Sequence, residues 1–102
     1  MDNTTSTGYV YVMTHSFFSD VIRISHTIDD PEEDAKFLSS QTPGEYKVVF
    51  SIECADPSRI NNQIKKYLTP KKYINEFYQT SIEVASKLLE RETLKIPTSN
   101  TF

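Results

Sequence analysis

The chain has 102 residues, which is enough for one small domain and too few for two. Hydrophobic residues make up 37% of the sequence, too large a share for an intrinsically disordered protein. The net charge of −3 argues against a protein that binds nucleic acid through an overall positive charge. The single cysteine, Cys54, excludes an intramolecular disulfide and a cysteine-based zinc site.

Both ends of the sequence are polar, and we expect mobile tails at residues 1–7 and 97–102 around one domain at residues 8–96. The first residues lack the apolar core of a signal peptide. No apolar run approaches the roughly 20 residues that a membrane-spanning helix needs. We therefore expect a soluble, intracellular protein without membrane contact.

The first half of the chain is predicted to form a hairpin and a helix. Residues 9–13 and 21–25 are rich in β-branched and aromatic side chains, and the short connection between them favours antiparallel pairing. Asp30 then has the side chain of a helix N-cap, and Pro31 suits the first helical turn. We expect this helix to continue to about residue 40.

A clear alternation follows over residues 46–53. Tyr46, Val48, Phe50 and Ile52 occupy every second position, and most of the residues between them are polar. A period of two residues indicates a β-strand with one buried face. We expect this strand to be the central strand of the sheet.

The second half is predicted to contain two helices with a short extended stretch at residues 76–78 between them. The first helix begins at Asp56, and the second begins at a capping box of Thr80 and Glu83. Each helix has one apolar stripe to bury. The stripes are Ile60, Ile64, Tyr67 and Leu68 in the first helix, and Ile82, Ala85, Leu88 and Leu89 in the second.

The predicted order of elements is β-β-α-β-α-(β)-α, which places the chain in the α/β (α+β) class. A small three-stranded antiparallel sheet flanked by helices satisfies this order, because each helix can then bury its apolar stripe. The sequence contains no internal repeat.

Four short motifs occur in the order found in the GIY-YIG nuclease superfamily. Tyr-Val-Tyr at residues 9–11 stands where the GIY triplet would be, and Arg-Ile-Ser at residues 23–25 replaces a basic residue, Ile and Gly. Residues 30–38 look like the first helix of the family, and Glu-Phe-Tyr at residues 76–78 looks like its Glu-Phe-Phe motif. The chain most resembles the compact branch of phages, large DNA viruses and bacteria, which is often described as a DNA-binding domain.

The resemblance implies a degraded active site. In active members a tyrosine activates water, a glutamate holds one divalent cation, and an arginine on the first helix neutralises the phosphate. Tyr11 and Glu76 match the tyrosine and the glutamate, but the position of the arginine holds Asp34, whose charge repels phosphate. Arg23 could point toward the sheet face that carries Tyr9 and Tyr11 and partly replace the lost arginine.

Three further positions depart from the family pattern. Ser25 replaces the usual glycine, and Asn61 and Lys65 stand where active relatives often carry Glu and His. We expect no cofactor, and Mg²⁺ or Mn²⁺ at Glu76 only if nuclease activity survives.

Charge is distributed unevenly along the sequence. Residues 29–34 hold five acids, and residues 59–72 hold five bases and no acid. The acids are Asp29, Asp30, Glu32, Glu33 and Asp34, and the bases are Arg59, Lys65, Lys66, Lys71 and Lys72. The bases have two interpretations: a nucleic-acid patch with Tyr67 and Tyr73 available for stacking, or the solvated face of an amphipathic helix and its loop.

These observations predict a catalytically degenerate domain that acts as a non-enzymatic structural or interaction module. A protein partner or a viral or other macromolecular assembly is expected, and a viral origin would place the protein in the virion or in the host cytoplasm or nucleus. Two alternatives stay open: a nucleic-acid-binding domain without cleavage, and a divergent DNA endonuclease that depends on a divalent metal.

Overall fold

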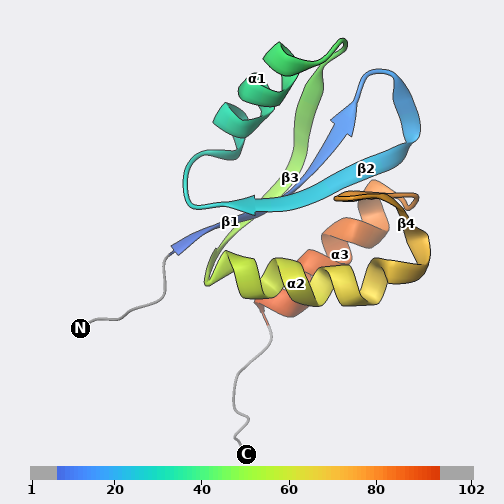
Figure 1. Ribbon diagram of the computed structural model, residues 1–102. Coiled ribbons are helices and arrows are strands. Elements are labelled where there is room, and N and C mark those ends of the chain that lie inside the picture. Colours follow the sequence, from blue (N-terminus) through green and yellow to red (C-terminus); the bar gives the residue numbers. More distant parts are fainter. Residues whose placement is uncertain (1–6, 95–102) are drawn as a thin grey trace, which may run out of the picture.

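Strand-forming segments and capped helices follow one another along the chain and fold into a single antiparallel sheet with helices on both faces (Figure 1). The computed structural model describes residues 7–94. The elements in chain order are β1 (Thr7–His15), β2 (Phe18–Thr27), α1 (Pro31–Gln41), β3 (Tyr46–Ala55), α2 (Pro57–Leu68), a 3₁₀ turn (Thr69–Lys71), β4 (Lys72–Ile74), β5 (Phe77–Tyr78) and α3 (Ile82–Thr93). The α+β class is confirmed. Apart from Thr7, which begins β1, the predicted tails lie outside the described residues.

Strand β1 is buried on both of its faces. Val10 and Val12 belong to the larger core cluster, between the sheet and helices α2 and α3. Tyr11 and Met13 point to the other face, where they meet Ala35 of α1. The buried members of the larger cluster are Val10, Val12, Ile22, Ile24, Ile60, Ile64, Leu68, Tyr78, Ala85 and Leu89. Helix α1 therefore covers one face of the sheet alone, and α2 and α3 share the other.

The sheet has five strands in the order β3-β1-β2-β5-β4, so the prediction of three strands was wrong in number. The predicted extended stretch at residues 76–78 is part of a small hairpin of β4 and β5, whose turn contains Asn75 at φ 49°. Strands of three and two residues are too short to show a period. Asparagine tolerates this left-handed backbone conformation better than most residues, and it was the one local indication of the turn.

Strand β3 lies at an edge of the sheet, so its prediction as the central strand was wrong. Clean alternation is typical of a strand with one face in solvent, whereas strands covered on both faces read as continuous apolar runs. Strand β3 also contains a bulge at Val49. The neighbouring residues Val12 and Met13 of β1 lie opposite Phe50 and Val48, so Val49 has no partner on β1 and the side chains on its two sides point to different faces of the sheet. Upstream of the bulge the apolar side chains face α1, and downstream they face α2 and α3.

The predicted caps of the first two helices are confirmed. Asp30 accepts a hydrogen bond from the backbone N–H of Glu32 at 3.0 Å, and Asp56 accepts from that of Arg59 at 3.4 Å. The cap of α3 is Ser81, one residue later than predicted, and its Oγ accepts from the N–H of Val84.

Two residues of the predicted apolar stripes lie outside the core. Ile82 is 40% exposed, because it is the first residue of α3 and lies at the end of that helix. Tyr67 is 48% exposed, and its ring lies beside the guanidinium of Arg91, 4.6 Å from the ring centroid. Within residues 7–94, no helix has the length and apolar character needed to cross a bilayer.

Candidate functional site

The candidate site lies on the sheet face that α1 partly covers. Residues opposite each other in an antiparallel pair point to the same face. Tyr11 lies opposite Ser25, and the next pair along this face is Met13 with Arg23. Glu76 reaches the same face from the turn between β4 and β5, where its backbone carbonyl accepts a hydrogen bond from the N–H of Ile24 at 3.0 Å. Three separate parts of the chain therefore meet here.

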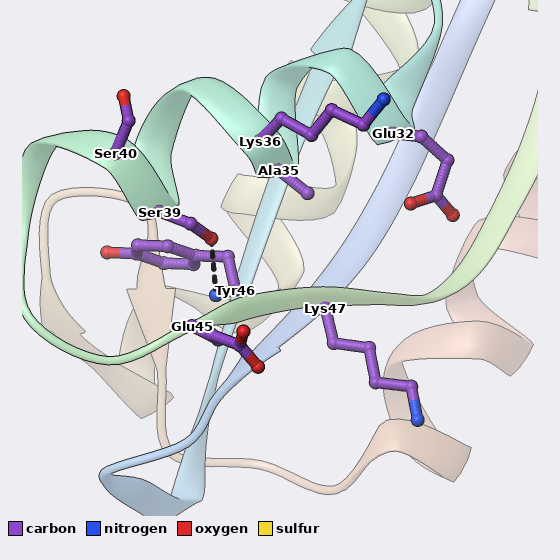
Figure 2. A pocket seen from close by; sticks show the side chains of 8 residues that line it. All are labelled: Glu32, Ala35, Lys36, Ser39, Ser40, Glu45, Tyr46 and Lys47. Atoms are coloured by element: carbon purple, nitrogen blue, oxygen red, sulfur yellow. Dashed lines mark hydrogen bonds between the residues drawn. The ribbon is translucent and has the colours of Figure 1, made fainter.

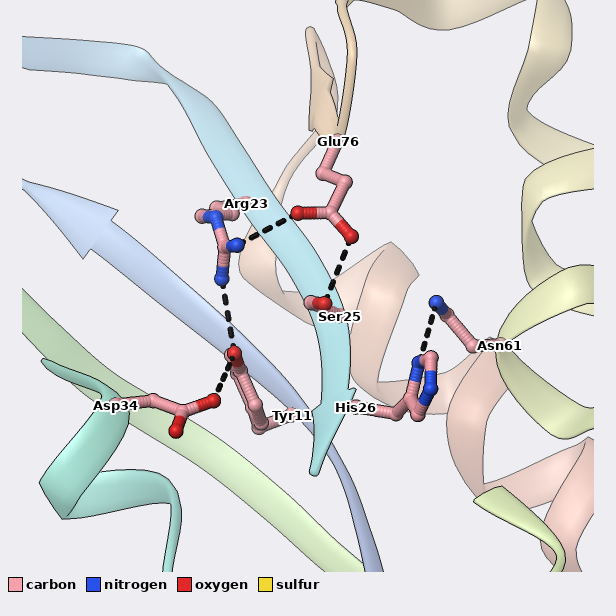
Figure 3. Close-up of polar contacts among 7 residues, drawn as sticks. All are labelled: Tyr11, Arg23, Ser25, His26, Asp34, Asn61 and Glu76. Carbon is pink, nitrogen blue, oxygen red and sulfur yellow. Dashed lines mark hydrogen bonds and ion pairs between the residues drawn. The ribbon is translucent and has the colours of Figure 1, made fainter. Parts of the chain in front are cut away.

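A continuous chain of hydrogen bonds joins these side chains (Figure 3). The Tyr11 hydroxyl donates to Oδ2 of Asp34 at 2.7 Å and accepts from Nη1 of Arg23 at 2.9 Å. The other terminal nitrogen of Arg23 donates to Oε1 of Glu76 at 2.6 Å. Ser25 donates to the second carboxylate oxygen of Glu76 at 2.8 Å. Both oxygens of Glu76 are thus engaged by groups of β2.

The ion pair between Arg23 and Glu76 is shielded from solvent. The Arg23 side chain is 14% exposed and the Glu76 side chain 29%, so water screens this pair less than it screens an exposed pair. The guanidinium also lies 5.9 Å from the ring centroid of Tyr11, within the range of a cation–π contact. The Arg23 cation therefore pairs directly with Glu76, and the Tyr11 hydroxyl links it to the carboxylate of Asp34.

The environment of Tyr11 keeps its phenol protonated. Burial is the largest cause and raises the pKa from 10.0 to about 12. The positive charge of Arg23 opposes this rise, and the hydrogen bond to Asp34 adds to it. At neutral pH the Tyr11 hydroxyl is consequently a hydrogen-bond donor and not a base.

The raised pKa predicts a loss of stability in alkali. Because the folded state holds this proton more tightly than the unfolded state does, Tyr11 stabilises the fold fully below pH 10.0 and loses that contribution as the pH rises toward about 12. A rise of this size corresponds to about 2–3 kcal/mol. Urea unfolding of the wild type and of Tyr11→Phe across this window should show a steeper decline for the wild type. Parallel declines would contradict the assignment of the pKa rise to Tyr11.

Tyr9, the remaining residue of the predicted catalytic set, and Asn61, at a position where active relatives often carry Glu, lie outside this chain of bonds. Tyr9 is half-buried on the same face, opposite Thr27 and Glu53. Asn61 is buried on the opposite side of the sheet, where its Nδ2 lies 3.0 Å from Nδ1 of His26 (Figure 3). A residue at position 61 therefore cannot contact Tyr11 or Glu76 in this fold.

The five predicted nucleic-acid contacts separate into two groups. Arg59 lies in the first turn of α2 and pairs with Asp56 at 3.5 Å. The four lysines lie together in sequence at the other end of α2, in its last turn, in the 3₁₀ turn and at the start of β4: Lys65, Lys66, Lys71 and Lys72. One of the two tyrosines proposed for stacking, Tyr67, already contacts Arg91.

A groove of about 500 Å³ lies between α1 and β3 (Figure 2). Its walls carry both charges, with Lys36 and Lys47 among the bases and Glu45 among the acids. The N–H of Tyr46 donates to Ser39 across its inner end at 2.9 Å. Neither Tyr11 nor Glu76 lines this groove, so the groove and the hydrogen-bonded chain are separate features.

Sequence reasoning missed the role of Ser25, which it treated only as a replacement for glycine. The spacing of two residues from Arg23 to Ser25 places both on one face of a strand, and this was the available indication that they could share a partner. Within residues 7–94, no group of three or more His, Cys, Asp or Glu residues is placed to hold a metal ion.

Comparison of the chain with protein-family models, with curated proteins and with solved structures yields no match. The resemblance to the GIY-YIG superfamily therefore stays a prediction from the short sequence motifs.

Proposed function

We propose that this chain is a catalytically degenerate GIY-YIG-like domain that serves as a non-enzymatic interaction module. The observation that carries the proposal is the state of Glu76, the residue that matches the metal-binding glutamate. Arg23 and Ser25 donate to its two oxygens, at 2.6 and 2.8 Å. A divalent cation at Glu76 would have to displace an arginine that already neutralises this carboxylate.

The position of Asp34 supports the same conclusion. The resemblance implies a phosphate-binding arginine there, and the carboxylate of Asp34 instead lies 2.7 Å from the Tyr11 hydroxyl. A phosphodiester placed beside Tyr11 would meet this negative charge. Losing one preorganised contact to the reacting group costs typically 10²–10³ in rate, and reversing its sign costs more.

The state of Tyr11 is a third argument. A tyrosine that activates water must accept a proton, and the pKa of this phenol is raised to about 12 by burial. Its hydroxyl group donates a hydrogen bond to Asp34 and accepts one from Arg23, so it is already engaged as donor and as acceptor. The residues that resemble catalytic groups therefore stabilise one another in the resting fold.

The direct test is incubation of the full chain with supercoiled plasmid in Mg²⁺ or Mn²⁺. We expect no nicking above that of the Glu76→Gln variant, which controls for contaminating nucleases. Nicking by the wild type that this variant abolishes would establish the alternative of a metal-dependent endonuclease and overturn the proposal.

A further inference from the structure

The two ends of the molecule carry opposite charge. We call Asp29, Asp30 and Glu32, together with the exposed Ile28 that precedes them, the acidic end. Asp30 caps α1, and within residues 7–94 no lysine or arginine forms an ion pair with these three carboxylates. The acidic end is thus an exposed isoleucine beside three acids without a cationic partner in the described part of the chain.

The other end combines lysines with an apolar pocket. We call it the basic end, and it consists of Lys65, Lys66, Lys71 and Lys72 with the pocket beside them. None of these four lysines forms an ion pair with a carboxylate of the described residues. The pocket measures about 120 Å³ and is lined only by apolar and aromatic side chains: Phe18, Val21, Tyr73, Ile74 and Phe77.

One molecule cannot bring its own two ends together. Ile28 lies beside Pro57, the first residue of α2, since both line the same small pocket. The lysines begin in the last turn of this 12-residue helix. A helix of that length spans about 18 Å, and Figure 1 shows α2 extending between the loop before α1 and the hairpin of β4 and β5.

We propose that the acidic end of one copy docks on the basic end of a second copy, with Ile28 in the apolar pocket and Asp29 and Asp30 against Lys71 and Lys72. The inference rests on the proposed function as an interaction module and names a second copy of this chain as its partner. The order of residues supports it, because Ile28 is followed by two acids, and the pocket residues Tyr73 and Ile74 are preceded by two lysines. A phosphate backbone would satisfy the lysines but would leave the apolar pocket exposed.

The contact joins two different surfaces, so it is heterologous and continues from copy to copy into chains or rings. Its polar part depends on charges in solvent, which salt screens strongly. We therefore expect reversible self-association that weakens at least about tenfold as NaCl rises from about 0.05 M to about 0.5 M. Ile28→Ser should weaken it by about tenfold as well, since the apolar anchor is lost.

A charge-swap experiment in sedimentation velocity tests the proposal on the full chain. Lys71→Glu with Lys72→Glu cancels the charge of the basic end and reverses it at the two positions proposed to face Asp29 and Asp30, and Asp29→Lys with Glu32→Lys makes the acidic end net positive while keeping the cap at Asp30. Each double variant alone should stay monomeric where the wild type associates, and an equimolar mixture should associate again. Lys47→Glu with Lys87→Glu, on β3 and α3 and outside both ends, changes the net charge as much as the first variant and should associate like the wild type.

Several results would overturn the proposal. The proposal is wrong if the wild type stays monomeric at low salt over about two decades of concentration, a result that does not depend on whether any variant folds. It is also wrong if either double variant associates as strongly as the wild type. If the wild type is monomeric but binds a single-stranded oligonucleotide through Lys71 and Lys72, these lysines bind the phosphates of nucleic acid and not a second copy of the chain. The plasmid assay is independent of these outcomes, so failure of self-association and failure of the non-enzymatic function are distinguishable.

Discussion

The Gly8→Ala variant should unfold at a far lower urea concentration than the wild type, with a loss of about 3 kcal/mol or more. Gly8 lies in β1 where the backbones of β1, β2 and the start of α2 come together. A Cβ at this position would lie 2.4 Å from the carbonyl oxygen of Thr27 and 3.0 Å from both Cα of Ile28 and Cγ of Pro57. Two of these atoms belong to the backbone, so no side-chain rotation relieves the overlap, and the strands must separate.

Thr7→Ala is the matched control for this change, since it alters the adjacent, exposed position of the same strand and should shift stability by less than about 1 kcal/mol. Equal slopes of the unfolding transitions would show that only stability has changed. An unfolding midpoint of Gly8→Ala close to that of Thr7→Ala would mean that β1 and the Thr27 carbonyl are farther apart in solution than in this structure.

The convergence of the site could be predicted from the sequence to a considerable extent. The hairpin places Tyr11 and Arg23 on one face by the two-residue period of a strand, and this expectation is confirmed. The helix that begins at Asp30 brings Asp34 to the same face next to Ala35. The first argument needs only the pairing of two consecutive strands, which their short connection favours, whereas the hydrogen bond from Tyr11 to Asp34 was not predicted.

Other features depended on long-range pairing, which periodicity does not encode. The bulge at Val49 exchanges the faces of β3, although apolar residues continue at every second position past it, and its trace in the sequence is the apolar Val49 at a position where the alternation otherwise has polar residues. The hairpin of β4 and β5 is too short to show a period, yet it carries Glu76 to β2. For this reason the sequence predicted Glu76 as a candidate residue but did not predict that Arg23 and Ser25 would be its partners.

Stability measurements can separate a structural role of Glu76 from a metal-binding one. Arg23→Met should cost about 2–3 kcal/mol, because it leaves the largely buried Glu76 carboxylate without its cation. Glu76→Gln should cost about 1–2 kcal/mol, because the Arg23 charge then lacks its partner. The double variant removes both charges at once, so it should cost less than the sum of the two, with a coupling of about 1–2 kcal/mol.

The exposed pair of Lys36 and Glu33 offers a matched control for this cycle. Its side chains are 75% and 65% exposed and 3.6 Å apart, so the cycle of Lys36→Met and Glu33→Gln should give a coupling of only a few tenths of a kcal/mol. Additive costs at Arg23 and Glu76 would mean that the two are not paired in solution, and Mn²⁺ should then raise the unfolding midpoint of the wild type but not of Glu76→Gln. Strong coupling without such a shift is the expected result, because a carboxylate that already holds an arginine gains little from exchanging it for a metal ion.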